Sequence, residues 1–216
     1  MKKLFASVCI AAILSTGGAM AEPRGTFRQA HELGFGANSD LDPASRGRVF
    51  QITEKIYSRL VRPGEDGRPS ADLATAWSSN DDATVWTLTL RDGVTFHHGS
   101  TFNADEVVYT LNRILDPATD SPVRSAIRMI TSVEAVSPTE VRLSLDTPFA
   151  DLPLQLMDYR LRIIPEGSGD TIAQTGIGTG PFRLVSFDAH GITRLEANMD
   201  YFLGPPGVAH MEIIGI

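Results

Sequence analysis

Two adjacent histidines, His97 and His98, are the first residues in this chain whose type suggests metal chemistry. Neighbouring side chains of an extended segment point to opposite faces, so the pair is poorly placed to chelate one ion. The sequence offers no pair of cysteines and no Glu-x-x-His spacing that would complete a metal site. We therefore expect a turn or surface role for these histidines, and we predict neither a metal nor a cofactor.

A glycine-rich segment at 176–180 resembles a phosphate-binding loop at first sight. Such loops need a helix behind them to present its N-terminal N–H groups, and usually a lysine. Here Pro181 and a predicted strand follow instead, which disfavours nucleotide binding. We expect the glycines to let the backbone cross between strands beside a cleft. The alternative is direct ligand contact by Gly178, Thr179 and Gly180, which we retain as candidate binding residues.

Four further side chains are candidates for ligand contact. Asn38, Ser39 and Asp40 follow a predicted strand, and strand ends border the crevice of an open sheet. Their polar atoms suit hydrogen bonding to an extended peptide, although an ordinary turn ahead of Pro43 explains them equally well. Tyr159 offers a ring and a hydroxyl, with placement in the core or on the surface as the alternative.

Catalytic chemistry finds little support in the sequence. The acidic residues are spread along the chain without forming a catalytic pair, and no Gly-x-Ser-x-Gly motif is present. The single cysteine, Cys9, lies in an apolar N-terminal run. We therefore predict a protein that is not an enzyme; a secreted hydrolase that uses dispersed Ser, His and Asp residues is the outside alternative.

The first 21 residues have the organisation of a secretory signal peptide. Lys2 and Lys3 precede an apolar run at 4–14, and Ala19 and Ala21 supply the small residues that a signal peptidase recognises. The run is too short to cross a bilayer comfortably, which takes about 20 apolar residues. We expect cleavage after Ala21, with an uncleaved anchor as the alternative.

The remaining residues have the composition of an acidic globular protein. The chain is 42% hydrophobic and 21% charged, and the loss of Lys2 and Lys3 would change its formal charge from -7 to -9. Without cysteine the fold must depend on an ordinary hydrophobic core. The negative charge argues against nucleic acid and anionic membranes as partners, and we expect a soluble protein.

Hydrophobic periodicity predicts an α+β (mixed α/β) fold without a regular βαβ repeat. The predicted helices lie at 49–60, 104–115 and 152–157. The predicted strands lie at 26–33, 85–90, 94–96, 132–136, 140–145, 160–164, 182–187, 192–197 and 208–214. The clearest helix has Asn103 as its N-cap and Glu106 as the capping-box partner, with Ala104, Val107, Val108, Leu111 and Leu115 on its buried face.

Six successive segments resemble one family, the periplasmic solute-binding proteins of ABC importers for peptides and related solutes, which is solute-binding family 5. The segments are KIYSRLV at 55–61, ADLATAW at 71–77, LRDGVTFHHG at 90–99, FNADEVVYTL at 102–111, GTGPFRL at 178–184 and EANMDYF at 196–202. Their order and spacing cover most of the chain after residue 21.

The resemblance implies the N-terminal lobe of a type II periplasmic binding protein-like fold, with the second lobe missing. Residues 1–21 would be the signal peptide and 22–216 the lobe, working in the periplasm. Its partners would be a peptide or related small solute and the permease subunits of the importer. Peptides, nickel chelates, glutathione and sugars all remain open as solutes. The alternative is a truncated remnant of such a protein that takes no part in transport.

Overall fold

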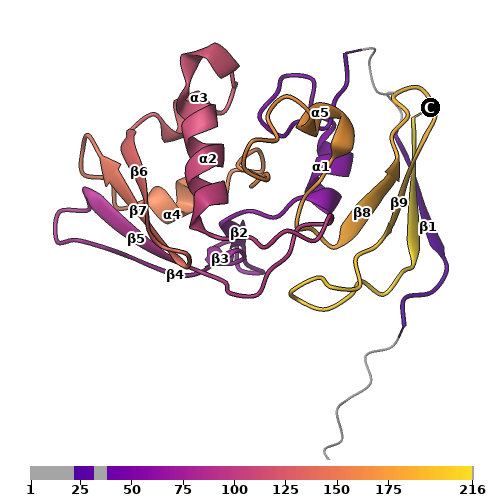
Figure 1. The fold of residues 1–216 in the computed structure, drawn as a ribbon, viewed down its shortest axis with the longest axis horizontal. Coiled ribbons are helices and arrows are strands. Elements are labelled where there is room, and N and C mark those ends of the chain that lie inside the picture. The colour runs from indigo at the N-terminus through magenta and orange to yellow at the C-terminus, as the bar shows by residue number, and fades with distance from the viewer. Residues whose placement is uncertain (1–21, 32–37, 216) are drawn as a thin grey trace, which may run out of the picture.

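The protein is described by a computed structural model that covers residues 22–31 and 38–215. The predicted signal peptide and the last two residues of the predicted strand at 26–33 lie outside the described residues. Two four-stranded sheets stand at opposite ends of the described structure, and the helices lie between them (Figure 1). The structure confirms the mixed α/β class.

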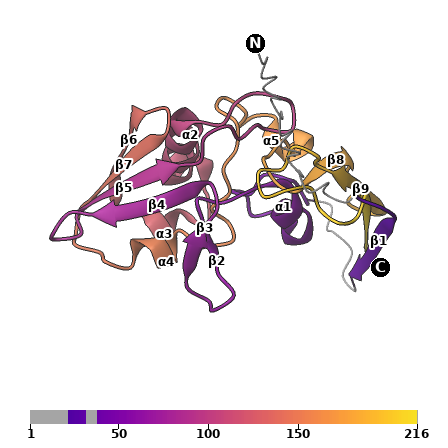
Figure 2. The same cartoon turned by 90° about the horizontal axis from the view of Figure 1, so that it is seen from below.

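The first sheet is antiparallel with the strand order β4-β5-β7-β6. Its strands are β4 (Ala74–Ser79), β5 (Val85–Leu90), β6 (Ile130–Ser137) and β7 (Glu140–Leu145). The strand predicted at 85–90 is confirmed as β5, and its Trp86, Leu88 and Leu90 are buried on one face. A short hairpin of β2 (Val61–Pro63) and β3 (Pro69–Ala71) projects from the molecule beside this sheet (Figure 2).

Helix α2 (Ala104–Leu115) packs against β6 and β7 and closes the first core. Its predicted capping box is present: the Asn103 side chain accepts from the Asp105 N–H at 2.6 Å, and Glu106 accepts from the Asn103 N–H at 2.8 Å. Ile114 completes the buried face, whereas the predicted Val108 and Leu115 are only partly buried against the same core. The short helices η1 (Pro117–Thr119) and α3 (Arg124–Ile127) contact α2, and α4 (Leu152–Gln155) places Leu152 in the same core.

The second sheet has the strand order β1-β10-β9-β8. Its strands are β1 (Thr26–His31), β8 (Phe182–Ser186), β9 (Ile192–Ala197) and β10 (His210–Gly215). Strands β1 and β10 pair in parallel, and the pairs β10–β9 and β9–β8 are antiparallel. Helices α1 (Phe50–Ile56) and α5 (Ile172–Thr175) pack on this sheet, and Ile52, Ile56, Phe182, Leu195 and Ile213 form the second core.

Two predicted strands do not form, and one predicted helix is too long. Residues 94–96 form only one bridge, between Thr95 and Thr101, because the chain reverses at 97–100. The predicted strand at 160–164 is also a single bridge, from Arg162 to Arg59. Leu161, Ile163 and Ile164 are all buried, so this segment runs through the interior and has no solvent-facing side. The predicted helix at 49–60 ends at Ile56, where the chain turns toward the other core.

Backbone hydrogen bonds join the two cores where the chain crosses between them. The N–H of Ile163 donates to the carbonyl of Ser58 at 3.1 Å, which pairs two crossing segments side by side. The N–H of His97 donates to the carbonyl of Gly178 at 2.9 Å and links the loop after β5 to the second core. These bonds fix the position of one core relative to the other.

Candidate functional site

Two exposed aromatic rings and two arginines meet beside the crossing segments. We call Arg48, Phe50, Tyr159 and Arg160 the aromatic–arginine cluster. The rings of Phe50 and Tyr159 pack edge to face with centroids 5.0 Å apart and an interplanar angle of 83°. Both guanidinium carbons lie 5.6 Å from the centroid of the Tyr159 ring, within the range of cation–π attraction.

The cluster draws on both cores. Phe50 is the first residue of α1, where the neighbouring Val49 and Ile52 enter the second core. Phe50 therefore points away from the buried stripe of its own helix and is 40% exposed. Tyr159 follows α4 and is 43% exposed. An aromatic patch of this kind offers apolar surface and a hydroxyl to a ligand.

A buried arginine holds the backbone of Tyr159. Arg162 is 4% exposed, and its Nε donates to the Tyr159 carbonyl at 2.8 Å while Nη1 donates to the Tyr57 carbonyl at 3.0 Å. The pKa of Arg162 is lowered to about 9, mainly by burial and in part by the charge of Arg59, against the attraction of Asp72. The position of the Tyr159 ring is thus set from inside the protein.

Only one of the two arginines has a carboxylate partner among the described residues. Arg160 binds Asp158 through Nε at 2.8 Å and Nη2 at 2.5 Å. Burial opposes the charge of Asp158, but the hydrogen bonds from Arg160 hold the pKa of Asp158 below its ordinary value. Arg48 donates to the Ser45 carbonyl at 2.6 Å and to the Tyr159 hydroxyl at 3.3 Å. Within residues 22–31 and 38–215, its Nε is buried without a hydrogen-bond partner.

The candidate loop residues Asn38, Ser39 and Asp40 lie at the start of the segment that carries Arg48. Asp40 accepts from the Asp42 N–H at 2.9 Å and from the Ser45 hydroxyl at 2.6 Å, and its backbone bridges to Arg48. Asp40 therefore organises the loop, while Asn38 is exposed and Ser39 is half-buried. Ligand contact by these three residues stays a prediction.

The glycine turn lies against the end of α1. A Cβ atom added at Gly178 would overlap the carbonyl oxygen of Ile56, and the N–H of Gly180 donates to that same oxygen at 3.0 Å. Thr179 between them is buried, and its hydroxyl has no partner among the described residues. These contacts explain the glycine spacing by close backbone approach; ligand contact by Gly178, Thr179 and Gly180 stays a prediction.

The two histidines have separate environments. His97 Nδ1 lies 3.3 Å from the Gly178 nitrogen, and its Nε2 lies 3.0 Å from the Gly180 oxygen. His98 is exposed beside Ser100. In the part of the chain that the structure describes, no three His, Cys, Asp or Glu residues are grouped to hold a metal ion.

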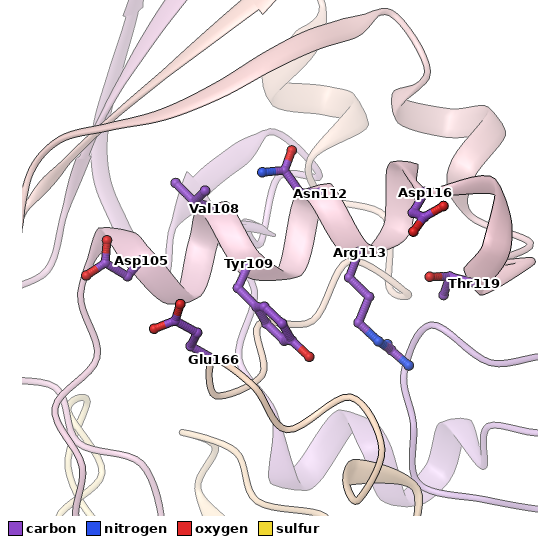
Figure 3. A pocket seen from close by; sticks show the side chains of 8 residues that line it. All are labelled: Asp105, Val108, Tyr109, Asn112, Arg113, Asp116, Thr119 and Glu166. Atoms are coloured by element: carbon purple, nitrogen blue, oxygen red, sulfur yellow. The ribbon is translucent and has the colours of Figure 1, made fainter.

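A groove of about 460 Å³ runs along α2, and two of its lining side chains, Tyr109 and Arg113, are already engaged by the protein (Figure 3). The Tyr109 hydroxyl accepts from the Gly169 N–H at 2.8 Å. Arg113 binds both oxygens of Asp42, at 2.6 and 3.2 Å. These contacts fasten two loops to the helix. We therefore assign the groove a structural role and take the aromatic–arginine cluster as the candidate site.

Comparison with known proteins identifies the family. Residues 68–216 match the model of the bacterial extracellular solute-binding proteins, family 5 middle region. The chain belongs to this family. It is 32% identical to di/tripeptide-binding protein 2 of Pseudomonas aeruginosa over 96% of the chain, but it covers 44% of that relative. The chain thus spans less than half the length of this family 5 relative.

Solved family 5 structures have the same fold. The periplasmic binding protein DppA of Helicobacter pylori, in complex with the peptide STSA, matches 89% of the chain with 26% identity and a TM-score of 0.79. AgaA of A. tumefaciens R10, in complex with agropinic acid, matches 89% with 27% identity and a TM-score of 0.80. The chain covers 43% and 40% of these proteins, so the described fold is a partial lobe. None of its described helices has the length and apolar character to cross a membrane.

Of the four cluster residues, the sequence analysis named only Tyr159 as a candidate, and ligand contact by Tyr159 stays a prediction. It did not name Arg48, Phe50 or Arg160. A usable signal existed for Phe50, because the apolar stripe of the helix runs through Val49, Ile52 and Ile56 and leaves this ring on another face. No such signal existed for Arg48, since its approach to Tyr159 joins positions 111 residues apart.

Proposed function

We propose that this chain is part of the substrate-binding component of an ABC importer, which captures a peptide or related small solute in the periplasm and delivers it to the permease. Family membership and the aromatic–arginine cluster support the proposal. The named ligands of the relatives, di- and tripeptides in one case and the peptide STSA in another, favour a peptide-type solute. Residues 1–21 would direct export as a signal peptide.

The decisive observation is the exposed pair of Phe50 and Tyr159 beside the junction of the two cores. The Tyr159 ring is held by two cation–π contacts and its carbonyl by the buried Arg162, and Phe50 packs edge to face on this ring. Little conformational freedom is therefore lost when a ligand covers the pair. An open aromatic surface contributes most to the binding free energy when a second surface closes on it and excludes water. Capture by closure fits this geometry, and a shift from 1:99 to 99:1 in favour of the closed state needs about 5.5 kcal/mol of differential binding.

Calorimetry on the natural polypeptide that carries these residues tests the proposal. Di- to pentapeptides are titrated into the wild type and into the double variant Phe50→Ala/Tyr159→Ala. We expect peptide binding by the wild type and at least a roughly tenfold loss of affinity in the variant, because aromatic anchors dominate binding energy.

The matched control is Val136→Ala, which removes another apolar side chain of similar exposure, 44%, from β6. This variant should keep the wild-type affinity. Absence of binding to every peptide length in the wild type would contradict the proposed function. Equal weakening by the control would instead show that the aromatic pair has no special part in binding.

A further inference from the structure

We propose that His97 makes the geometry of the aromatic–arginine cluster sensitive to acid. A second proton on its ring releases the glycine turn, and the change reaches the cluster through Tyr57 and Arg162. A lower affinity for the solute at low pH follows from this. The effect on affinity rests on the proposed function, whereas the structural change does not.

His97 is fastened to the glycine turn at three points. Its N–H donates to the Gly178 carbonyl at 2.9 Å, and its Nδ1 accepts from the Gly178 N–H at 3.3 Å. Its Nε2 donates to the Gly180 carbonyl at 3.0 Å. A proton on Nδ1 would face the Gly178 N–H, and two donors cannot share a hydrogen bond. Protonation of the ring therefore breaks a contact that joins the loop after β5 to the second core.

The glycine turn lies directly against the end of α1. The N–H of Gly180 donates to the Ile56 carbonyl at 3.0 Å. A Cβ atom added at Gly178 would lie 2.6 Å from a ring carbon of Tyr57, so the backbone of the turn touches this ring. Tyr57 is 1% exposed, and closely packed interiors transmit displacement. A shift of the turn is therefore passed to Tyr57.

Tyr57 is bonded toward both sides of the aromatic–arginine cluster. Its carbonyl accepts from Nη1 of Arg162 at 3.0 Å, and Nε of this arginine donates to the Tyr159 carbonyl at 2.8 Å. Its hydroxyl donates to the Leu41 carbonyl at 2.9 Å, in the loop that carries Arg48. A displacement of Tyr57 thus reaches Tyr159 and Arg48 together.

The surroundings of His97 allow it to take up a proton in acid. Its ring lines a pocket of about 260 Å³, which gives water access to it. The other titratable or charged side chains of this pocket are Arg183 of β8, Glu196 of β9 and His98 of the same loop. On α1, Lys55 pairs with Glu54 at 2.8 Å. The pKa of His97 is lowered to about 4, mainly by burial, so the ring is neutral near pH 7.

Fluorine NMR of the natural polypeptide, labelled with 3-fluorotyrosine, tests the structural change without any solute. The four tyrosines report separately, and Tyr→Phe variants assign their resonances. From pH 7 to pH 3.5 we expect the resonances of Tyr57 and Tyr159 to shift together, with a midpoint at about pH 4. The resonance of Tyr109 on α2 should keep its folded position. His97→Gln keeps a donor and an acceptor but does not titrate, so both shifts should be absent.

The matched control is His98→Gln. His98 is exposed, and among the described residues its ring contacts Ser100 rather than the glycine turn. This variant should keep both shifts, with a midpoint close to that of the wild type.

Calorimetry with a mixed tripeptide library measures the effect on the solute. A pKa of about 4 leaves about a quarter of the His97 rings neutral at pH 3.5. Between pH 6 and pH 3.5 the affinity of the wild type should therefore fall about fourfold more than that of His97→Gln.

The outcomes are distinguishable. Shifts that are absent from the wild type, or that persist in His97→Gln, overturn the proposal and leave the proposed function standing. Loss of the folded Tyr109 resonance at the same midpoint would show general unfolding and overturn it as well. Equal losses of affinity in the wild type and His97→Gln overturn the effect on the solute. If the wild type binds no member of the library, the proposed function fails together with that effect, and the fluorine shifts still decide the structural change.

Discussion

The hydrogen bonds of His97 predict that acid weakens this fold through one identifiable side chain. The Gly178 N–H can only donate, so Nδ1 of His97 must accept it, and Nε2 must carry the proton that is donated to the Gly180 carbonyl. The imidazole is therefore neutral in the folded protein. A second proton on Nδ1 would face the Gly178 N–H and break one of the two contacts with the glycine turn.

The size of the effect follows from the pKa. The pKa of His97 is lowered from its ordinary 6.5 to about 4, mainly by burial; the charges of Arg183 and His98 act in the same direction, and the hydrogen bond to Gly180 opposes them. Because the folded pKa lies below the unfolded one, the stabilising contribution is complete above pH 6.5 and is lost as the pH falls toward 4. Between pH 8 and pH 4 the protein should lose about 3 kcal/mol of unfolding free energy through this group.

Urea unfolding at pH 8, 6, 5 and 4 measures the loss in the wild type and in His97→Gln. Glutamine keeps a donor and an acceptor but does not titrate, so the variant should lose about 3 kcal/mol less than the wild type over this range. His190→Gln is the matched control, because His190 is exposed in the turn between β8 and β9 and should leave the wild-type profile unchanged. Parallel profiles for wild type and His97→Gln would refute the reasoning.

Two other perturbations test the packing that holds the site. Gly178→Ala should destabilise the protein by more than about 2 kcal/mol, because a Cβ would overlap a carbonyl oxygen of α1. The control Gly207→Ala adds a Cβ in open space and should change the stability by less than about 0.5 kcal/mol. Equal midpoints of thermal unfolding in the two variants would contradict this expectation. Asp42→Asn should cost about 3 to 5 kcal/mol, because it leaves the half-buried Arg113 without its charge partner; a urea midpoint within error of the wild type would show that the pair is not needed.

Local structure was predicted where the sequence carries local information. The capping box at Asn103 and Glu106 depends on residues three positions apart, and the strand predicted at 85–90 depends on residues two apart; both were confirmed. The predicted strand at 160–164 failed for the opposite reason. The sequence Arg-Leu-Arg-Ile-Ile at 160–164 fits a strand with one polar face, but the structure buries Arg162 together with its apolar neighbours, and only the tertiary position of the segment decides this.

The parallel pairing of β1 with β10 could not be predicted from local sequence either. These strands are at opposite ends of the chain, and nothing in either segment specifies the other as its neighbour. Tyr159 was a candidate on residue type alone, but its significance depends on Arg48 and Phe50, which reach it from a distant segment. A site assembled from two cores cannot be read from either one.

The buried Arg162 connects these observations. A cation in the interior costs free energy unless its donors have acceptors. Arg162 donates to the carbonyl of Tyr57, which is 105 residues away in the sequence, and to the carbonyl of Tyr159, which is three residues away. The free energy of satisfying this charge is therefore spent on holding two crossing segments together. Because Tyr159 in turn orients Arg48, the placement of the exposed cluster depends on a side chain that no ligand would touch. The junction between the two cores sets the geometry of the aromatic–arginine cluster, so the residue types at the surface do not reveal the cluster by themselves.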